Sequence, residues 1–526
     1  MLMCVLASFS KAQSAALVRE SNAVPHRGVY EIALAAPVGD RNPYFDVDLR
    51  VLFTRPDETL VTVDGFYDGG ETFRARAYSD MPGRWQWRSI SNVTELDGRS
   101  GTFDVVASEL PGKLRKHPDD PHQLAYDNGQ WFLHLGDTGY RYVTDTEPQW
   151  QAYIDQAAAV GFTKIRTWFC QGRSDVQALF AEQRSEMNVP YWQEIDRRLT
   201  YALNHYPHVI FQLIPYGEDT AEIARYGQGD RAALLVGRYT QARFSAFANI
   251  YWCLSNDRHI VSRSPMRGRD VSPHVIDRMG MEFRRREPWG TLITNHQQRF
   301  QGYSFVDAPW SDIITLEDLD EVAGAAILQY RQLGDDPVIL DEDRYELYRP
   351  PAHPRYYFRR LMWASLLSGG SATYGGMKTY EPHDGELCGV QGYADAVQAG
   401  KLVGGAHDFQ YIHQFFADTG VTLAGMEPAD AMAGYQPHDC KCVANDEHII
   451  VYLQNPDGAA PEKADVAKTK ASVRIHLPRH TYDARWYQPT TGQWAEGNEV
   501  KQIVGGFDRT LKAPFAGDAV LWLRRR

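Results

Sequence analysis

The chain is poor in cysteine and lacks the long apolar and basic segments that mark membrane and nucleic-acid-binding proteins. Six cysteines occur in 526 residues, and Cys440 and Cys442 lie too close together for a mutual disulfide or a zinc site. No stretch of about 18 apolar residues is present, which excludes a transmembrane helix. The net charge is −12, without a long run of lysine and arginine. We therefore expect no disulfide framework, no membrane span and no nucleic-acid partner.

The N-terminus lacks the basic segment of a signal peptide but otherwise resembles one. Met1–Phe9 is apolar, and the small residues AQSAA follow at 12–16. This pattern indicates a clipped leader, so we expect a periplasmic or secreted protein and leave a cytoplasmic location open. Residues 1–25 are interpreted as a signal remnant or a disordered segment.

Aromatic residues, unlike cysteine, are abundant in this chain. The chain has 13 Trp and 29 Tyr. The C–H faces of sugar rings stack on such side chains, which favours a carbohydrate partner, but β-rich cores also use many aromatics. Composition alone leaves both interpretations open.

The pattern of apolar residues predicts an α/β and β protein of three parts. Residues 26–112 and 416–526 show short, mostly alternating strand-like runs broken by Gly, Pro, Asp and Asn, which is typical of β-sandwich domains. The runs are Tyr30–Leu34, Val47–Phe53, Leu60–Gly65, Phe73–Tyr78 and Trp85–Ser89, then His448–Leu453, Ala471–Leu477, Tyr482–Tyr487 and Ala519–Leu523.

Residues 113–415 alternate apolar strand-like runs with amphipathic helical patterns, which predicts a (β/α)8 TIM barrel between the two sandwiches. A doubly wound sheet is the main competitor, but GDTGY at 136–140 is not its Gly-rich phosphate turn. The predicted strands are Trp131–Leu135, Lys164–Phe169, Val209–Ile214, Ile250–Leu254, Thr291–Thr294, Ile313–Leu316, Val338–Leu340 and Ala372–Tyr374. The predicted helices include Trp150–Val160, Trp192–Tyr206, Gly229–Ala248, Val275–Arg286 and Tyr356–Ser368.

Active residues of a barrel project from the carboxyl ends of its strands. Asp257 follows the fourth predicted strand and Glu342 the seventh, on different sides of the mouth. Hydrolysis of an acetal needs one carboxylic acid for the leaving oxygen and a second carboxylate that attacks or activates water. These two residues are therefore the candidate pair, and Glu317, at the end of the sixth strand, is the main rival.

Four motifs resemble those of known barrels. NIYWCLSND (249–257) looks like the fourth-strand motif of clan A glycoside hydrolases, and IRTWF (165–169) fits that clan's second-strand arginine. PVILDEDRYE (337–346) and WFLHLGDTGYRYV (131–143) look like the seventh- and first-strand motifs of the apiosidase-like barrel family. The regions before and after the barrel resemble the β domains often fused to such enzymes.

The resemblance implies roles for four residues. Glu342 would be the nucleophile and Asp257 the acid/base, with a raised pKa from burial or from the charge of Glu342. Asn256 would hold the sugar hydroxyl next to the reacting carbon, and Arg166 would keep Glu342 ionised. Most of clan A has Asn-Glu where this chain has Asn256-Asp257.

Further residues near the strand ends are candidates for substrate binding. Each has a structural alternative: loop stabilisation for Asp137, a satisfied structural histidine for His296, and barrel packing for the aromatic residues. Tyr140 stands where the family motif usually has Trp. The set is Asp137, Tyr140, Trp168, His296, Tyr345 and Tyr374. No metal site is predicted, because His296 and His383 lack well-spaced partners, and no cofactor is expected.

The sequence thus predicts a retaining glycoside hydrolase that acts on a poly- or oligosaccharide. Retention predicts carboxyl groups ~5–5.5 Å apart, and inversion ~9 Å. Two alternatives stay open: a polysaccharide lyase that uses Tyr345, His296 and Arg166, and a non-catalytic glycan-binding protein on a barrel scaffold. The sugar, its linkage and the oligomeric state are not predicted.

Overall fold

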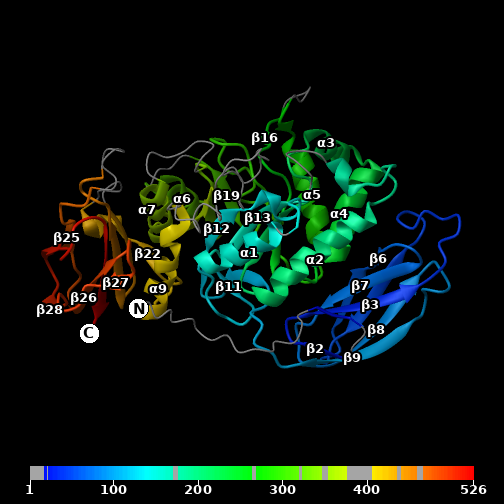
Figure 1. Ribbon diagram of the computed structural model, residues 1–526, viewed down its shortest axis with the longest axis horizontal. Coiled ribbons are helices and arrows are strands. Elements are labelled where there is room, and N and C mark those ends of the chain that lie inside the picture. The colour runs from blue at the N-terminus through cyan, green and yellow to red at the C-terminus, as the bar shows by residue number, and fades with distance from the viewer. Residues whose placement is uncertain are drawn as a thin grey trace.

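The computed structural model describes residues 17–19, 22–147, 149–169, 176–262, 268–318, 323–345, 354–375, 405–434, 440–458 and 466–526. Residues 1–16 of the segment 1–25, which was interpreted as a signal remnant or a disordered segment, lie outside this part, as do Cys4, Cys170, His383 and Cys388. Within the same segment, Leu17–Arg19 and Ala23–Pro25 form strands, so the interpretation is wrong for these residues. Along its longest axis the molecule has a β region from the N-terminal part at one end, a barrel in the middle, and a second β region at the other end (Figure 1).

The central barrel has eight parallel strands in the order β18-β15-β14-β13-β12-β21-β20-β19. An isolated bridge between His296 and Thr315 lies at the seam between β18 and β19, so the barrel is nearly closed. This architecture confirms the predicted TIM barrel with flanking β regions. The strands are β12 (Leu135–Thr138), β13 (Lys164–Trp168), β14 (Ile210–Ile214), β15 (Ile250–Cys253), β18 (Ile293–Thr294), β19 (Ile314–Glu317), β20 (Val338–Glu342) and β21 (Ser371–Tyr374).

One predicted strand is displaced along the sequence. Trp131 bridges Ala125 below the barrel instead of starting the first barrel strand. Strand β12 therefore begins at Leu135 and includes Gly136–Thr138, which the sequence had suggested to follow the strand.

The helices lie around the barrel, and side-chain caps start several of them. Asp219 caps α3 by accepting a hydrogen bond from the backbone N–H of Glu222. Asp230 caps α4 in the same way with Ala233, so α4 begins at Arg231 and not at the predicted residue 229. The helices are α1 (Gln149–Val160), α2 (Val189–His205), α3 (Thr220–Gln228), α4 (Arg231–Phe244), α5 (Pro273–Arg286), α6 (Ala325–Arg331), α7 (Pro354–Leu367) and α9 (Phe409–Thr419).

A hairpin of β10 (Leu114–His117) and β11 (Asp120–Tyr126) closes the amino-terminal end of the barrel. Leu114, Leu124 and Tyr126 form one buried cluster with residues of the barrel strands, including Ile210 and Ile339. Figure 1 shows β11 below the barrel strands and the short strand β16 (His259–Ile260), which pairs with β17 (Asp270–Val271), above them. The opposite, carboxyl-terminal end is therefore where side chains can meet a substrate.

The N-terminal β region consists of two sheets. The first has the order β1-β3-β7-β6 and the second β2-β9-β8-β4-β5. The alternation of buried and exposed residues along β4 and β5 is what places one face of each strand in the core. The strands are β1 (Leu17–Arg19), β2 (Ala23–Pro25), β3 (Val29–Ala35), β4 (Leu49–Thr54), β5 (Leu60–Asp64), β6 (Phe66–Tyr67), β7 (Thr72–Tyr78), β8 (Gly83–Ser91) and β9 (Ser100–Val106).

The C-terminal β region has a seven-stranded antiparallel sheet and a two-stranded sheet of β25 and β29, which share a buried core. Cys440 and Cys442 are buried here and form no disulfide within the described part of the chain, as is the case for Cys253 in the barrel. The strands are β22 (Glu427–Pro428), β23 (Cys440–Ala444), β24 (His448–Leu453), β25 (Ser472–His476), β26 (Thr481–Gln488), β27 (Gln493–Trp494), β28 (Val500–Val504), β29 (Asp508–Lys512) and β30 (Ala519–Arg525). Among the described helices, none has both the length and the apolar character needed to cross a bilayer.

A buried ion network joins the N-terminal sheets to the barrel. Arg76 of β7 contacts Glu31 of β3 at 2.7 Å and Asp196 of α2 at 2.8 Å. Arg243 of α4 contacts the same Asp196 at 2.5 Å and Asp68 at 2.7 Å. All of these charged side chains are buried, so each depends on its partners for compensation.

Arg76→Met should lower the free energy of unfolding by about 3–5 kcal/mol, because Glu31 and Asp196 would keep buried charges without their shared partner. Urea unfolding followed by tryptophan fluorescence measures this change. Arg88→Met, an exposed arginine of the same β region, is the matched control and should change stability by less than about 0.5 kcal/mol. Equal effects of the two substitutions would contradict a structural role for the network.

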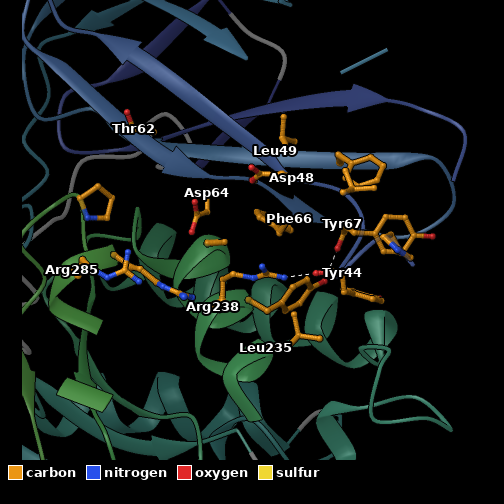
Figure 2. A pocket seen from close by; sticks show the side chains of 18 residues that line it. Tyr44, Asp48, Leu49, Thr62, Asp64, Phe66, Tyr67, Leu235, Arg238 and Arg285 are labelled. Carbon is orange, nitrogen blue, oxygen red and sulfur yellow. Dashed lines mark hydrogen bonds between the residues drawn. The ribbon is translucent and has the colours of Figure 1, made fainter. Parts of the chain in front are cut away.

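A cavity of about 360 Å³ lies beside this junction, between the N-terminal sheets and α4. Figure 2 shows Arg238 reaching from the barrel side to the backbone oxygen of Tyr44, with Asp64 and Asp48 on the sheet side. None of the residues that line it belongs to the candidate carboxylate pair, so this cavity is separate from the predicted site.

Candidate active site

Four ionisable side chains meet at the carboxyl ends of the barrel strands. One ligand-type atom from each of Asp257, His296, Glu317 and Glu342 lies within 4.8 Å of those of the others. Asp257 and His296 follow β15 and β18, while Glu317 and Glu342 are the last residues of β19 and β20. Adjacent strand ends therefore bring together residues that are up to 85 positions apart in the sequence, as 342 − 257 shows.

Arg166 of β13 is the fully buried cation at the centre of the cluster. Its Nη1 donates to Glu342 Oε2 at 2.8 Å and to the backbone oxygen of Asp341 at 3.2 Å, and its Nη2 donates to Asn256 Oδ1. The hydroxyl of Tyr140 lies 3.4 Å from both Glu342 Oε2 and Asn256 Oδ1. These contacts orient the Glu342 carboxylate and balance its charge.

Asp257 has basic side chains on several sides. Its Oδ1 lies 3.1 Å from His296 Nδ1 and 3.8 Å from Arg166, and its Oδ2 lies 3.7 Å from Arg269. Burial alone raises the pKa of Asp257, but the close approach of His296 and the charges of Arg166 and Arg269 outweigh it and hold the pKa well below its usual range. The sequence-based expectation of a raised pKa is therefore wrong, and Asp257 is ionised at neutral pH.

Glu317 is the carboxyl group that holds a proton instead. Burial, and next the charges of Glu342 and Asp257, raise its pKa to about 10. Arg299 opposes this shift only in part, with its Nε 3.0 Å from Glu317 Oε1 and its backbone N–H donating to Oε2 at 2.8 Å. The cluster thus combines an ionised Asp257 with a protonated Glu317.

Glu317→Gln should stabilise the fold above neutral pH. Between the ordinary pKa of 4.5 and about 10, the folded protein binds a proton that the unfolded chain does not, so the free energy of unfolding falls as pH rises through this window. Glutamine copies the neutral acid and removes that loss, which we expect to be at most about 5 kcal/mol at pH 8 and absent near pH 4. Thermal unfolding at both pH values measures the difference.

The exposed Glu496→Gln is the control for this experiment and should show no such pH dependence. A Glu317→Gln protein whose melting temperature tracks the wild type at pH 8 would show that Glu317 is ionised in the folded protein.

The other predicted site residues divide into two groups. Asn256, His296 and Tyr140 lie in the cluster, and Trp168 stacks on Tyr140 at 4.1 Å between ring centroids. Tyr345 belongs to the same buried aromatic group. Trp168 and Tyr345 are about 1% and 3% exposed, so they support the site from below and present no open face to a sugar.

Asp137 and Tyr374 lie away from the cluster. Asp137 accepts a hydrogen bond of 2.6 Å from Tyr153 of α1, which places its side chain on the helical side of the barrel wall. Tyr374 packs against Phe162, Phe358 and Phe409, at centroid distances of 4.6–5.8 Å. These contacts are those of the structural alternative to substrate binding, and they arise because alternate residues of a strand face opposite sides of the sheet.

Sequence reasoning missed three arginines around the cluster. Arg269 precedes β17, Arg299 lies between β18 and β19, and Arg258 directly follows Asp257. Arg258 Nη2 and Arg269 Nη2 lie 3.4 and 3.7 Å from Glu218 Oε2. Only the position of Arg258, next to a candidate residue, gave a signal in the sequence, since the others come from loops.

The four-residue cluster also has the composition of a metal site, which sequence spacing did not reveal because each group comes from a different strand. However, Arg166, Arg269 and Arg299 lie 2.8–3.8 Å from its carboxylates. These guanidinium groups supply the positive charge that a cation would otherwise provide. The donor set therefore favours carboxylate chemistry over metal binding.

Below the cluster, Lys164 and Asp341 form a fully buried ion pair. Burial, partly offset by Asp341, lowers the pKa of Lys164 to about 8. Thr373 donates to Asp341 Oδ1 at 2.7 Å, so the pair fixes the strand that ends in Glu342. The segment 378–389, which follows β21, and part of 171–188, which follows β13, lie outside the described residues.

Comparisons with known proteins agree with this geometry. Residues 119–422 match the family model described as the apiosidase-like catalytic domain, and residues 24–92 match a domain of unknown function, DUF5060. A presumed glycoside hydrolase from Bacteroides vulgatus ATCC 8482 superposes with a TM-score of 0.75 at 16% identity, over 96% of this chain and 100% of that one. A family 5 glycoside hydrolase from the same organism gives a TM-score of 0.60 at 15% identity, over 79% and 94%. At such identities the likeness shows the fold. None of the curated proteins searched matches the chain.

Proposed function

The chain belongs to the apiosidase-like family, and on this basis we propose that it is a glycoside hydrolase that cleaves a poly- or oligosaccharide with retention of configuration. Glu342 is the nucleophile and Asp257 the acid/base. The observation that carries the proposal is the approach of these two carboxylates at the barrel mouth, with functional atoms within 4.8 Å. This upper limit is compatible with the ~5–5.5 Å spacing of retaining enzymes and lies well below the ~9 Å of inverting ones.

In the first step, Glu342 attacks the anomeric carbon while the leaving oxygen takes a proton. Arg166 holds Glu342 Oε2 at 2.8 Å, so the carboxylate is oriented before substrate arrives. Attack forms a glycosyl ester on Glu342 and breaks the bond to the leaving sugar.

The ionised state of Asp257 requires a source for the proton that it delivers. Glu317 carries that proton and lies within 4.8 Å of Asp257, measured between ligand-type oxygens. The charge of Glu342 is one cause of the high pKa of Glu317, and ester formation removes this charge. The pKa of Glu317 therefore falls as the bond breaks, and its proton can pass through Asp257 to the leaving oxygen.

In the second step, the ionised Asp257 accepts a proton from water, whose oxygen attacks the anomeric carbon of the ester. Glu342 leaves as a carboxylate, and its returning charge draws the proton back to Glu317. The low pKa of Asp257 suits an acceptor that is always ionised in the resting site, at the cost of weak intrinsic basicity.

The arrangement gives little support to a lyase. The candidate bases for that reaction are Tyr345, which is buried against Trp168 and Tyr140, and His296, which is engaged by Asp257. A non-catalytic glycan-binding protein would have no use for three carboxyl groups and an arginine held in one buried cluster.

A panel of polysaccharides and 4-nitrophenyl glycosides tests the proposal. We expect release of reducing ends from at least one substrate, with NMR detecting the product first in the anomeric form of the substrate. Initial formation of the opposite anomer would contradict retention, and an unsaturated product would show a lyase. Absence of turnover on every substrate would favour the binding-protein alternative.

A further inference from the structure

The loop between β18 and β19 presents one aromatic ring to solvent beside the carboxylate cluster. We define residues 297–302 as the platform loop. Phe300 within it is 69% exposed, the highest value among the large apolar side chains in the described part of the chain. Exposing the apolar surface of a phenylalanine to water is unfavourable in free energy, so the exposure of Phe300 needs a reason.

The platform loop is bonded to all three strand ends that carry the carboxylates. The backbone N–H of Phe300 donates to the carbonyl of Glu317 at 3.2 Å, and that of Gln298 to the carbonyl of Arg258 at 3.0 Å. Arg299 donates from Nη2 to the carbonyl of Asp343 at 3.1 Å. Glu317 is the protonated acid of the cluster. Arg258 directly follows Asp257 in the sequence, and Asp343 directly follows Glu342. The backbone that carries the Phe300 ring is therefore held in a defined place relative to the reacting groups.

The backbone at Phe300 is strained. Its φ is 63°, in the left-handed region that favours glycine, and Asp257 in the cluster shares this feature with a φ of 48°. Strained residues persist where the surrounding structure fixes them, and they gather at ligand sites. At this φ a glycine or an asparagine would be accepted at lower cost than phenylalanine.

No packing role accounts for the ring. Phe507, the other strongly exposed phenylalanine, lies under the guanidinium group of Arg509, 4.1 Å from the ring centroid. Phe300 makes no ring or cation contact with any residue that the structure describes. Its free face is thus available to a ligand.

We propose that Phe300 is a stacking platform for a sugar ring of the substrate, one position beyond the bond that is cleaved. The buried cluster accommodates the reacting bond. Phe300 lies outside this cluster, on the platform loop, and is exposed. The C–H face of a pyranose or furanose ring is apolar and fits a flat aromatic surface, which selects an oligosaccharide over a glycoside with a small leaving group. The inference rests on the proposed function, because it assigns a further subsite to the same active site.

The test compares Phe300→Asn with Phe300→Tyr. Asparagine accepts the positive φ and removes the ring, while tyrosine keeps the ring. On the oligosaccharide that the wild type hydrolyses in the glycan panel, we expect Phe300→Asn to raise KM about tenfold with a much smaller effect on kcat, and Phe300→Tyr to restore KM. The ratio of kcat/KM for this oligosaccharide to that for the 4-nitrophenyl glycoside should fall about tenfold in Phe300→Asn.

Phe507→Asn is the matched control, since it removes an exposed ring far along the chain and should leave KM unchanged. The same oligosaccharide titrated into the Glu342→Gln protein by calorimetry gives a readout without turnover, and adding Phe300→Asn should weaken binding by a similar factor.

A Phe300→Asn protein with the KM and affinity of the Phe507→Asn protein would overturn the platform while leaving the hydrolase proposal intact. A kcat loss without a KM change would also overturn it, because it would show a positioning effect on Glu317. A wild-type protein that neither binds nor cleaves any glycan in the panel would overturn both proposals.

Discussion

Glu342→Gln is expected to reduce kcat by a factor on the order of 10⁴ to 10⁶ on every substrate, the largest effect of any single change in the chain. Glutamine has nearly the same shape and can still accept the hydrogen bond that Arg166 donates to Oε2 at 2.8 Å. It cannot form the glycosyl ester, so the loss reports nucleophilic catalysis and not a disturbed fold. Initial rates on the best substrate of the glycan panel, with circular dichroism as a check of folding, give the comparison.

Glu447→Gln is the matched control, because the side chain of Glu447 is 80% accessible. The kcat of this variant should equal that of the wild type. If Glu342→Gln kept more than about a tenth of the wild-type kcat, Glu342 could not be the nucleophile. Mass spectrometry of a slow fluoroglycoside reaction should then locate the covalent sugar on another residue.

Asp257→Asn is expected to lower kcat/KM by about 10²- to 10⁴-fold on oligosaccharides, whose leaving oxygen needs a proton. On 4-nitrophenyl glycosides the loss of kcat/KM should be far smaller, because nitrophenolate leaves without protonation. The glycosyl ester then accumulates, since no base activates water, and added azide should raise kcat because azide needs no deprotonation. Kinetics on both substrate types, with and without azide, provide the measurement.

Glu317→Gln separates Asp257 from its rival. Glu317→Gln should turn over more slowly, because the proton that Glu317 carries is lost. If Asp257 exchanges protons directly with the leaving oxygen and with water, azide should not raise the kcat of this variant. The reverse pattern, with azide rescue in Glu317→Gln and none in Asp257→Asn, would transfer the acid/base role to Glu317. Both variants replace a carboxyl group of the same cluster by an amide of the same size, so each serves as the other's control.

The ionised Asp257 and the protonated Glu317 arise from their surroundings. Asp257 lies near His296, Arg166 and Arg269, whereas Glu317 faces Glu342 and Asp257 with Arg299 as its main counter-charge. A site with one carboxyl group charged and one neutral at the same pH has an acid and a base available together. This division is the electrostatic basis of the proposed proton path.

The sequence by itself was sufficient for the barrel. The eight strands were predicted from apolar runs alternating with helical patterns, because a parallel strand buried on both faces leaves a nearly continuous hydrophobic signal. Placement of Asp257, Glu317 and Glu342 at the mouth followed from the rule that strand carboxyl ends meet at one edge. The first strand was the exception, since Trp131 pairs with the hairpin below the barrel.

Tertiary structure decided the protonation state and the neighbours of each residue. The pKa of Asp257 is lowered by His296 first, and then by Arg166 and Arg269. These residues come from other strands and from a loop, and no local pattern encodes their approach, so the predicted direction was wrong. Asp137 and Tyr374 face the helices because a single step along a strand reverses the side. Phe300 gave no signal at all, since exposure and positive φ are properties of a folded loop. Periodicity is local and determines which elements form, whereas charge, strain and exposure depend on distant segments and exist only once those elements are assembled.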